Sequence, residues 1–399
     1  MHYMEIGGAE SALIGLLQAI DYSRYDVDLF LHAHRGEMMQ FIPKEVNLLP
    51  EISAYACIES SMAEAMRRWQ FGVLLGRLKA KWRARRYKSQ RPGQAQCAIY
   101  QYVAQEVESH LPSLHQLGDY DLAVSFLQPH NYVLSKVKAK KKACWIHTDY
   151  TKVEFDVGEE LPVWTAFDYI VGISPETIKA FLQVFPSLES KTVEMENILS
   201  PKFVRSRADD DLNDNINLNG DGKVVKLLSV GRFSDAKNYD NVPDICRRII
   251  FSLFTLHSSL SVRWFLIGYG GLESLIRQKI KEAGMEEHVI IFGKRTNPYP
   301  YIKACDIYVQ PSRYEGKSVT VREAQMLCKP VVVTNYTTAS SQIQDGIDGR
   351  IVPMDNEGCA KGIADLILDK ELQQRIVDYL QTHDYGNEKE IEKFYKLIP

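Results

Sequence analysis

Residues 307–333 alternate between apolar and polar segments in the order expected for strand, loop, helix and strand. The apolar run Ile307–Val309 is followed by the polar loop 310–318, then by the helical segment 319–327, and then by the apolar run Val331–Val333. Two strands joined through a helix form the βαβ unit of a parallel sheet. The stretch therefore predicts an α/β fold, with the loop at the carboxyl end of the first strand.

Two carboxylates flank the start of the predicted helix. Glu315 lies in the loop, and Glu323 lies one or two turns into the helix. Backbone N–H groups near a helix N-terminus bind anions well. We expect Glu315 to accept hydroxyl groups of a sugar and Glu323 to accept those of a ribose, with phosphate between them. The residues between the carboxylates that we predict to contact this ligand are Gly316, Lys317, Ser318 and Val319.

Further apolar runs in the second half, at 226–230, 262–267 and 289–292, each end at a glycine or a cation. Parallel strands bring such segments to one edge of the sheet. Arg232 and Lys237 suit a diphosphate there, because arginine offers a fork of donors and lysine a point charge. Taken singly, these residues could equally form a salt-bridged loop or a charged surface. The predicted contact residues on these segments are Gly231, Arg232, Lys237 and Lys294.

The first half of the chain predicts another series of strands. Gly7-Gly8 precedes a helical pattern, and only five or six residues are available for a strand before it, so we expect a truncated first strand. The glycine pair either lets a diphosphate approach the helix N-terminus or forms a plain tight turn. The predicted strands of this half cover 26–32, 46–49, 121–127, 143–146, 168–172 and 193–195.

Polar residues follow the run 143–146. His147 and Asp149 lie just past its end, where ligands bind in α/β sheets. A lone histidine at such a position can also be purely structural. We take His147 as a candidate catalytic residue and Asp149 as a candidate for the acceptor side.

Residues 67–91 contain ten basic and no acidic side chains. Phe71, Leu74, Leu75, Leu78 and Trp82 recur at helical spacing, which predicts one apolar side. A basic amphipathic helix favours an anionic membrane surface. The alternatives are a solvated helix whose apolar stripe packs on its own domain, and a nucleic-acid patch, for which no motif is present. The residues that we expect at the membrane are Trp82, Arg83, Arg85 and Arg86.

The length of 399 residues exceeds what one core usually supports and predicts two domains. We place the first domain at 1–204, a polar linker at 205–223, the second domain at 224–384, and a helix that returns to the first domain at 385–399. Seven scattered cysteines without a Cys-x-x-Cys pair indicate a reducing compartment, and no signal peptide or membrane span is visible. The net charge of -3 gives no bias toward nucleic acid.

Several of these segments together resemble the retaining GT-B glycosyltransferases of family 4, which carry an E-x7-E motif. Gly7–Glu10 and His147 also fit the N-terminal half of that family. The resemblance covers nearly the whole chain. The second-half segments that carry it are 229–233 with Lys237-Asn238, 297–301, and 311–318 with Glu323-Ala324.

This resemblance implies two doubly wound Rossmann-like domains facing a cleft, with a UDP- or GDP-linked sugar on the C-terminal domain. Arg232 and Lys237 would clamp the diphosphate, which would leave no need for a metal or another cofactor. Glu315 would address the donor sugar, and Glu323 would address the ribose.

The resemblance also assigns roles in the first half: Gly8 would meet the diphosphate, and His147 would lie near the sugar. The family usually has a small or proline-like residue where this chain has Lys317. The role of Lys317 therefore stays open.

The expected activity is that of a retaining hexosyltransferase in cell-surface polysaccharide synthesis. Its acceptor would be a saccharide or a lipid-linked saccharide, and the enzyme would lie in the cytoplasm, peripherally on the inner face of the cell membrane. One alternative is a nucleotide-sugar epimerase of the same architecture. Another is a non-catalytic nucleotide-binding subunit of an assembly complex.

Overall fold

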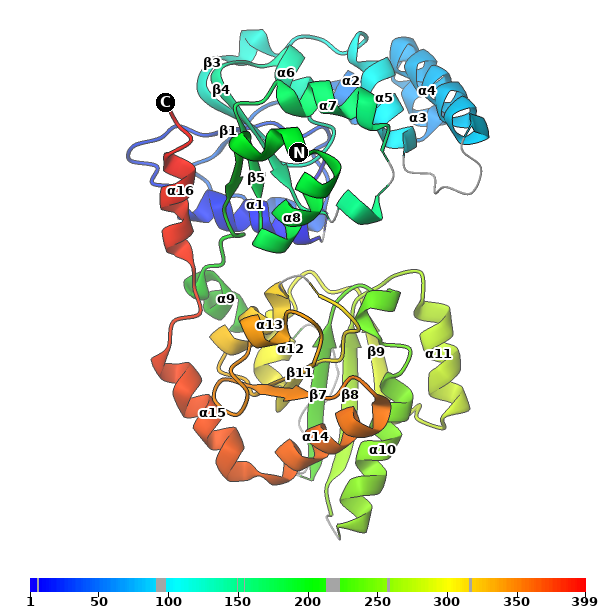
Figure 1. Ribbon diagram of the computed structural model, residues 1–399, viewed down its shortest axis with the longest axis vertical. Coiled ribbons are helices and arrows are strands. Elements are labelled where there is room, and N and C mark those ends of the chain that lie inside the picture. Colours follow the sequence, from blue (N-terminus) through cyan, green and yellow to red (C-terminus); the bar gives the residue numbers. More distant parts are fainter. Residues whose placement is uncertain are drawn as a thin grey trace. The chain divides into compact units, whose positions relative to one another are not determined.

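The computed structural model in Figure 1 describes residues 1–5, 7–90, 98–148, 150–153, 155–212, 223–256, 259–315 and 318–399. It divides the chain into two compact units. Unit 1 comprises Met1–Ile198 and Asn387–Pro399, and unit 2 comprises Leu199–Gly386. Each unit is built from parallel strands and helices, as expected for an α/β chain.

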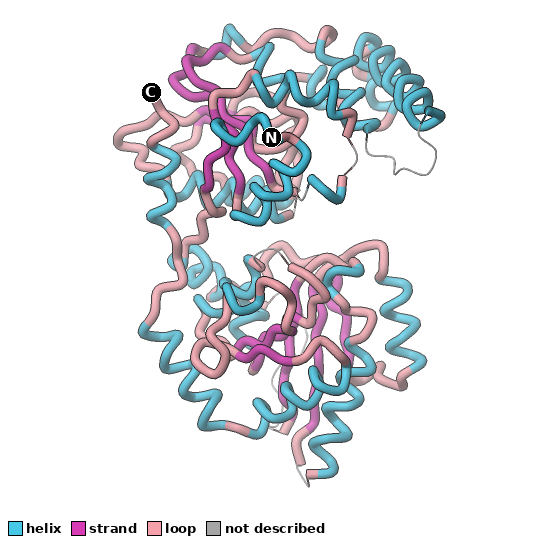
Figure 2. Tube along the Cα trace, in the orientation of Figure 1, coloured by secondary structure: helices cyan, strands magenta, loops and turns pink. Residues whose placement is uncertain are grey.

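Unit 2 contains one parallel sheet of six strands (Figure 2). β12 lies at one end of the strand order and is therefore an edge strand. Across the sheet the strands are β12 (Arg350–Val352), β11 (Val331–Thr334), β10 (Ile307–Gln310), β7 (Val224–Val230), β8 (Ser261–Ile267) and β9 (Val289–Gly293).

Helices cover both faces of this sheet, because consecutive strand residues point to opposite sides. Leu227 packs with α10, α14 and α15, whereas Leu228 packs with α12 and α13. The sheet is doubly wound, because both of its faces are apolar and both are covered by helices. The helices of unit 2 are α9 (Pro201–Ala208), α10 (Val242–Thr255), α11 (Glu273–Glu282), α12 (Tyr299–Ala304), α13 (Val319–Met326), α14 (Asn356–Leu368) and α15 (Lys370–Thr382), with short 3-10 turns η5 (Asp235–Lys237) and η6 (Ala339–Ser341).

Unit 1 contains two separate parallel sheets. One pairs β1 (Asp28–Leu29) with β2 (Asn47–Leu48). The other has, in spatial order, β3 (Asp119–Ser125), β4 (Lys138–Ile146), β5 (Tyr169–Gly172) and β6 (Thr192–Glu194).

The helices of unit 1 surround these two sheets. Ser174 caps α8 by accepting a hydrogen bond from the Thr177 N–H, as the Ser-Pro pair in the sequence predicts. The helices are α1 (Gly8–Ala19), α2 (Ser53–Ala56), α3 (Met62–Arg67), α4 (Phe71–Gln90), α5 (Ala98–Glu108), α6 (Asn131–Lys136), α7 (Val157–Thr165), α8 (Pro175–Val184) and α16 (Ile391–Tyr395), with 3-10 turns η1 (Glu37–Phe41), η2 (His115–Leu117), η3 (Tyr150–Lys152), η4 (Pro186–Lys191) and η7 (Glu388–Glu390).

The C-terminal segment belongs to unit 1, where η7 and α16 replace one continuous helix. The Tyr395 ring stacks on Tyr25 at 4.8 Å between centroids, and the Phe394 ring lies 6.1 Å from Trp145. The segment is held by aromatic contacts to residues near the start and the middle of the chain.

The basic run at 138–142 forms the first half of β4. Its Lys138, Lys140 and Lys141 side chains pair with Asp119, Asp121 and Asp168. The polar stretch expected to be a linker begins inside α9 of unit 2, and its residues 213–222 lie outside the described residues.

The six cysteines in the described ranges, including Cys144 and Cys246, are all free thiols. None of the helices in the part of the chain that the structure describes is both long enough and apolar enough to span a bilayer.

Candidate functional site

The loops after β7, β8 and β9 meet at one edge of the unit 2 sheet. The Gly231 N–H donates to the Ile267 carbonyl at 2.9 Å, and the Gly268 N–H donates to the Gly293 carbonyl at 2.9 Å. The Phe233 N–H donates to the Tyr269 carbonyl, also at 2.9 Å. The predicted convergence of these three post-strand loops is therefore confirmed.

Glycine is required where these loops pack backbone against backbone. Gly268 and Gly270 have φ of +151° and +157°, which side chains rarely tolerate. A Cβ atom on Gly268 would overlap the Gly231 carbonyl, and one on Gly270 would overlap the Phe233 carbonyl. A Cβ on Gly231 would lie 3.1 Å from Lys237 Cε, so this glycine leaves room for the lysine side chain.

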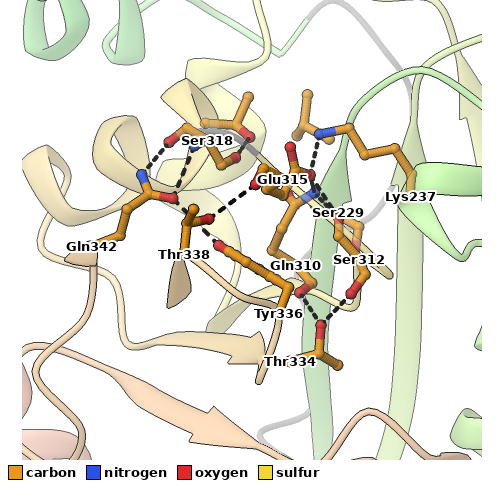
Figure 3. Close-up of polar contacts among 12 residues, drawn as sticks. Ser229, Lys237, Gln310, Ser312, Glu315, Ser318, Thr334, Tyr336, Thr338 and Gln342 are labelled. Atoms are coloured by element: carbon orange, nitrogen blue, oxygen red, sulfur yellow. Dashed lines mark hydrogen bonds and ion pairs between the residues drawn. The ribbon is translucent and has the colours of Figure 1, made fainter. Parts of the chain in front are cut away.

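An ion pair joins the loop after β7 to the loop after β10. Lys237 Nζ lies 2.5 Å from Glu315 Oε1, and both side chains are largely shielded from solvent (Figure 3). The same oxygen accepts hydrogen bonds from Ser312 Oγ at 2.6 Å and from Gln310 Nε2 at 2.9 Å. Glu315 Oε2 has no partner among the described residues.

Residues from two further segments fix the backbone around Glu315. Thr338 Oγ1 donates to the Glu315 carbonyl at 2.9 Å, and Thr334 Oγ1 donates to the Ser312 carbonyl at 2.6 Å. The Gln342 amide accepts from the Ser318 N–H and donates to the Ser318 carbonyl, at 2.9 and 3.0 Å (Figure 3). The carboxylate is thus held in position from both sides of the loop.

Arg313 ties this loop to the segment that carries Lys237. The Arg313 guanidinium donates to both oxygens of Asp240 at 3.0 Å. The backbone N–H of Arg313 donates to the Ala236 carbonyl at 2.8 Å. Such a two-point contact fixes orientation as well as distance. The geometry of the Lys237–Glu315 pair therefore depends on Arg313.

The other two cations at this edge differ from Lys237. Arg232 is exposed, and no side-chain hydrogen bond or ion pair joins it to another described residue. Lys294 Nζ lies 5.4 Å from the centre of the Tyr269 ring, within the range of a cation–π contact. Among the described residues of this edge, Arg232 is therefore a cation that is open to a ligand.

Glu323 lies in the second turn of α13, as predicted, and is almost completely buried. Tyr299 OH donates to Glu323 Oε1 at 2.7 Å. Burial raises the pKa of Glu323 to about 7, and the Tyr299 hydrogen bond opposes this only in part. Val319 begins α13 and Ser318 is its N-cap residue, whereas Gly316 and Lys317 lie outside the described residues.

In unit 1, His147 follows the end of β4. Its Nε2 atom is buried and has no hydrogen-bond partner among the described residues, and its ring lies 4.8 Å from that of Phe126. Burial lowers the pKa of His147 to about 4, although a hydrogen bond with the Phe126 backbone opposes this, so the ring is neutral near pH 7. Asp149 lies outside the described residues.

The glycine pair is placed at the start of α1. Gly7 is the N-cap residue, and a Cβ on it would collide with the Glu10 carboxylate. A Cβ on Gly8 would meet nothing within 4 Å. The Glu10 carboxylate is the end of a flexible side chain that can move aside, so packing within unit 1 requires glycine at neither position.

An apolar stripe on α3 and α4 faces outward. Its six side chains are each more than half exposed, which excludes packing on their own unit. Leu74, predicted on the same side, instead points into the core with Val73. The members of the stripe are Met66, Trp69, Phe71, Leu75, Leu78 and Trp82.

The basic residues of α4 divide into two groups. Arg83 pairs with Glu106 at 2.7 Å and with Glu159 at 3.0 Å, so it fastens α4 to its neighbours rather than facing outward. Arg85 and Arg86 are exposed, and the Arg86 guanidinium lies 5.7 Å from the Trp82 ring centre. Arg85 and Arg86, unlike Arg83, are therefore exposed near the apolar stripe.

Sequence reasoning missed the residues that hold the site together. Gln310 ends the buried strand β10 and Ser312 lies two residues beyond it, and that position is a usable signal. Tyr299 comes from α12, and Thr338 and Gln342 flank η6; nothing local to them in the sequence points to Glu323, Glu315 or Ser318. Among the described residues, no group of three or more His, Cys, Asp and Glu side chains is arranged to hold a metal ion.

Comparisons with known proteins agree with this architecture. Residues 211–383 match the family described as "Glycosyl transferases group 1". The crystal structure of Anabaena HepE in complex with UDP-glucose superposes with a TM-score of 0.63 at 17% identity, covering 99% of this chain and 98% of HepE. That likeness shows the fold, which is GT-B.

Curated relatives match over shorter stretches. An N-acetylgalactosaminyltransferase of Campylobacter jejuni is 28% identical over 39% of this chain and 41% of its own length. Its name gives a diphospho-undecaprenol-linked saccharide as its acceptor. The lipopolysaccharide core mannosyltransferase LpsB of Rhizobium meliloti is 30% identical over 21% of this chain and 24% of its own. The chain thus spans less than half of these relatives. Residues 211–383 thus match the glycosyl transferases group 1 family, within a chain of GT-B fold.

Proposed function

We propose that this chain is a retaining glycosyltransferase that moves a hexose from a nucleotide-diphosphate sugar to a saccharide acceptor. The observation that carries the proposal is the edge of unit 2, where the loops after β7 and β10 are joined by Lys237 and Glu315. Arg232 stands exposed on the first of these loops. The cationic side chains suit an anionic leaving group, and the carboxylate suits a sugar with many hydroxyl groups.

The diphosphate is assigned to Arg232 and Lys237. Positive charge that is already in place when a phosphate leaves lowers the barrier, because little reorganisation is needed at that moment. The contacts of Lys237 with Glu315 keep its ammonium in one position before any ligand binds. In this proposal the two cations take the part that a metal plays elsewhere.

The sugar and the ribose are assigned to the two carboxylates. Glu315 has one oxygen that accepts from three donors, and its second oxygen, to which no described residue donates, would accept from sugar hydroxyl groups. Glu323 has one oxygen on Tyr299, and its other oxygen would accept from the ribose. The N–H groups of Ser318 and Val319, near the start of α13, and the side chain of Lys294 complete the donor side.

Retention places the acceptor hydroxyl on the same face of the sugar as the departing phosphate, which is a suitable acceptor for the hydroxyl proton. We assign no carboxylate as a nucleophile. In unit 1, neutral His147 and the Gly7-Gly8 turn are assigned to the reacting side. The departing nucleotide is UDP or GDP.

The acceptor is proposed to be a lipid-linked saccharide used in cell-surface polysaccharide synthesis. The diphospho-undecaprenol in the name of the Campylobacter relative and the lipopolysaccharide core in that of LpsB support this assignment. The α3–α4 apolar stripe, flanked by Arg85 and Arg86, suits an anionic bilayer surface. We therefore place the enzyme peripherally on the cytoplasmic face of the cell membrane.

The test is an assay of the purified chain with radiolabelled UDP- and GDP-hexoses, with and without an extract of lipid-linked saccharides. The expected result is label in the lipid fraction only when the extract is present, with the donor's anomeric configuration in the product. An epimerase would convert the donor without acceptor. A binding subunit would give neither product, and either outcome would overturn the proposal.

A further inference from the structure

The β4–α7 segment follows the strand end at which His147 lies, and the structure describes it at residues 147, 148, 150–153 and 155–156. Its last residue, Asp156, is the N-cap residue of α7. An aspartate at this position usually accepts a hydrogen bond from an N–H of the first helical turn, but the Asp156 side chain makes no such bond. Its partners lie on another helix.

Two consecutive residues of α5 bind the backbone N–H, the carbonyl and the carboxylate of Asp156. The Gln101 side-chain amide accepts from the Asp156 N–H and donates to the Asp156 carbonyl, both at 3.0 Å. Tyr102 OH donates to Asp156 Oδ2 at 2.9 Å. Gln101 and Tyr102 are almost completely buried. Such hydrogen bonds are costly to break, because removing one partner leaves the other buried and unsatisfied.

The neighbouring helix α4 contacts the same segment. Tyr87 OH donates to the Phe155 carbonyl at 3.2 Å. The Phe155 ring stacks on that of Tyr150 at 4.8 Å between centroids. Tyr150 is buried and lies three positions after His147. The contacts from α4 and α5 therefore reach back toward the start of the segment.

The two helices that hold the segment are packed closely together. A Cβ atom on Gly76 of α4 would lie 2.7 Å from the Glu106 carbonyl oxygen of α5, so the two backbones nearly touch. Arg83 of α4 pairs with Glu106 and also with Glu159 in the first turn of α7. Because tightly packed elements transmit displacements, α4 and α5 should move as one body.

The outer side of the same two helices carries the apolar stripe. Leu75, Leu78 and Trp82 of α4 are exposed, whereas Arg83 and Tyr87 of the same helix contact α5, α7 and the β4–α7 segment. Figure 1 shows α4, α5 and α7 side by side in unit 1. The surface assigned to the bilayer and the support of the β4–α7 segment therefore belong to the same pair of helices.

We propose that the α4–α5 pair positions the β4–α7 segment, with Gln101 as the positioning residue. This inference rests on the proposed function, in which His147 lies on the reacting side and the apolar stripe lies on the bilayer. The apolar chain of a lipid-linked acceptor holds that acceptor at the bilayer surface. A rigid connection from the stripe to the segment would present the saccharide to His147 at a fixed distance from that surface, which favours the geometry for transfer.

The test compares Gln101→Ala with Gln105→Ala. Gln105 lies one turn further along α5 and accepts from Arg83 within the α4–α5 pair, so its replacement controls for the stability of the pair. Hydrogen exchange is followed in residues 155–160, with β3 and β5 as the reference within unit 1. Gln101→Ala should speed exchange in 155–160 about tenfold or more, because two hydrogen bonds to Asp156 are lost. Gln105→Ala should match the parent chain.

Activity gives a second readout. With the lipid-linked acceptor in anionic vesicles, Gln101→Ala should raise the KM for the acceptor about tenfold, because the loosened segment no longer holds the acceptor side in place. Nucleotide affinity and flotation with vesicles should stay as in the parent chain. A purely structural defect would instead lower kcat through the amount of folded enzyme and leave KM unchanged.

Exchange in 155–160 that is unchanged by Gln101→Ala would overturn the proposal, and so would faster exchange throughout unit 1 or an unchanged acceptor KM. If the parent chain transfers no sugar, the proposed function fails, and the exchange comparison still decides whether Gln101 positions the segment. If Gln101→Ala does not fold, Tyr102→Phe, which removes only the hydroxyl donor to Asp156, takes its place with the same expected and contrary results.

Discussion

Lys237 Nζ and Glu315 Oε1 lie 2.5 Å apart, although 78 positions separate them in the sequence. The pair links the loop after β7 to the loop after β10, and Arg313 holds the two loops together beside it. The site's charge is therefore positioned by the fold before any ligand arrives.

Replacing either Arg232 or Lys237 by alanine should lower turnover about 10²–10³-fold, the usual effect of removing one preorganised donor to a developing negative charge. Arg232→Ala should leave the unfolding temperature unchanged, because its side chain is exposed and unpartnered among the described residues. Initial-rate assays with the donor identified by screening provide the measurement. Lys281→Ala, an exposed cation on α11, is the matched control; equal rates in all three variants would refute the clamp.

The Lys237–Glu315 pair should contribute to stability as well as to binding. In a double-mutant cycle with alanine at both positions, urea unfolding should give a coupling free energy of about 1–3 kcal/mol, because the pair is largely shielded and in direct contact. The exposed pair Lys361–Asp365 on α14 is the control, with an expected coupling of about 0.3–0.5 kcal/mol. Equal coupling in the two cycles would show that the shielding of Lys237 and Glu315 has no energetic effect.

Glu323 should make unit 2 less stable as the pH rises. Its carboxyl stays protonated to about pH 7 when folded but ionises near 4.5 when unfolded, so between these values the folded state binds the extra proton. Stability is thus lost from pH 4.5 to 7, by about 3 kcal/mol from this group. The free energy of unfolding in urea should be compared for Glu323→Gln and the parent chain at pH 4.5 and at pH 8. Relative to the parent chain, the variant should become more stable by that amount as the pH is raised. If the difference in free energy of unfolding between the variant and the parent chain does not vary with pH, Glu323 is not a buried carboxyl that stays protonated to about pH 7.

We predict that the α3–α4 apolar stripe is the surface that binds the membrane. The double variant Leu75→Ser/Leu78→Ser should bind anionic vesicles about 10²-fold more weakly, because two apolar side chains no longer insert. Phe251→Ser/Phe254→Ser, which changes exposed apolar residues of α10, should bind like the parent chain. Flotation with vesicles of phosphatidylglycerol and phosphatidylcholine measures both. If the parent chain does not float, the proposed location at the membrane is wrong.

The sequence predicts features that depend on neighbouring residues. Every strand expected in unit 2 is present, and Ser174 caps its helix, because apolar runs and capping residues are local properties of the sequence. The sequence places Leu74, Leu75 and Leu78 on one apolar side of α4, yet Leu75 and Leu78 are exposed and Leu74 is buried, since a stripe of fixed spacing does not say which helix packs beside it. The pairing of Arg83 with Glu106 and Glu159 arises from that packing.

Contacts between distant loops could not be predicted in the same way. Tyr299 on Glu323, and Thr338 beside Glu315, join segments more than 20 positions apart. Lys138, Lys140 and Lys141 formed a basic cluster in the sequence, yet they lie on β4 beside three aspartates of neighbouring strands. In each case the partner residue is set by which segments pack side by side in the fold, and this cannot be read from one segment of the sequence.

The central claim is that the edge of unit 2 holds the diphosphate of a nucleotide sugar. Isothermal titration of the purified chain with UDP and with GDP tests it most directly, because no acceptor is needed. We predict that one of the two binds in the micromolar range, that Arg232→Ala weakens this binding tenfold or more, and that Lys281→Ala leaves it unchanged. A folded chain that binds neither nucleotide, or that binds one equally well without Arg232, would contradict the account.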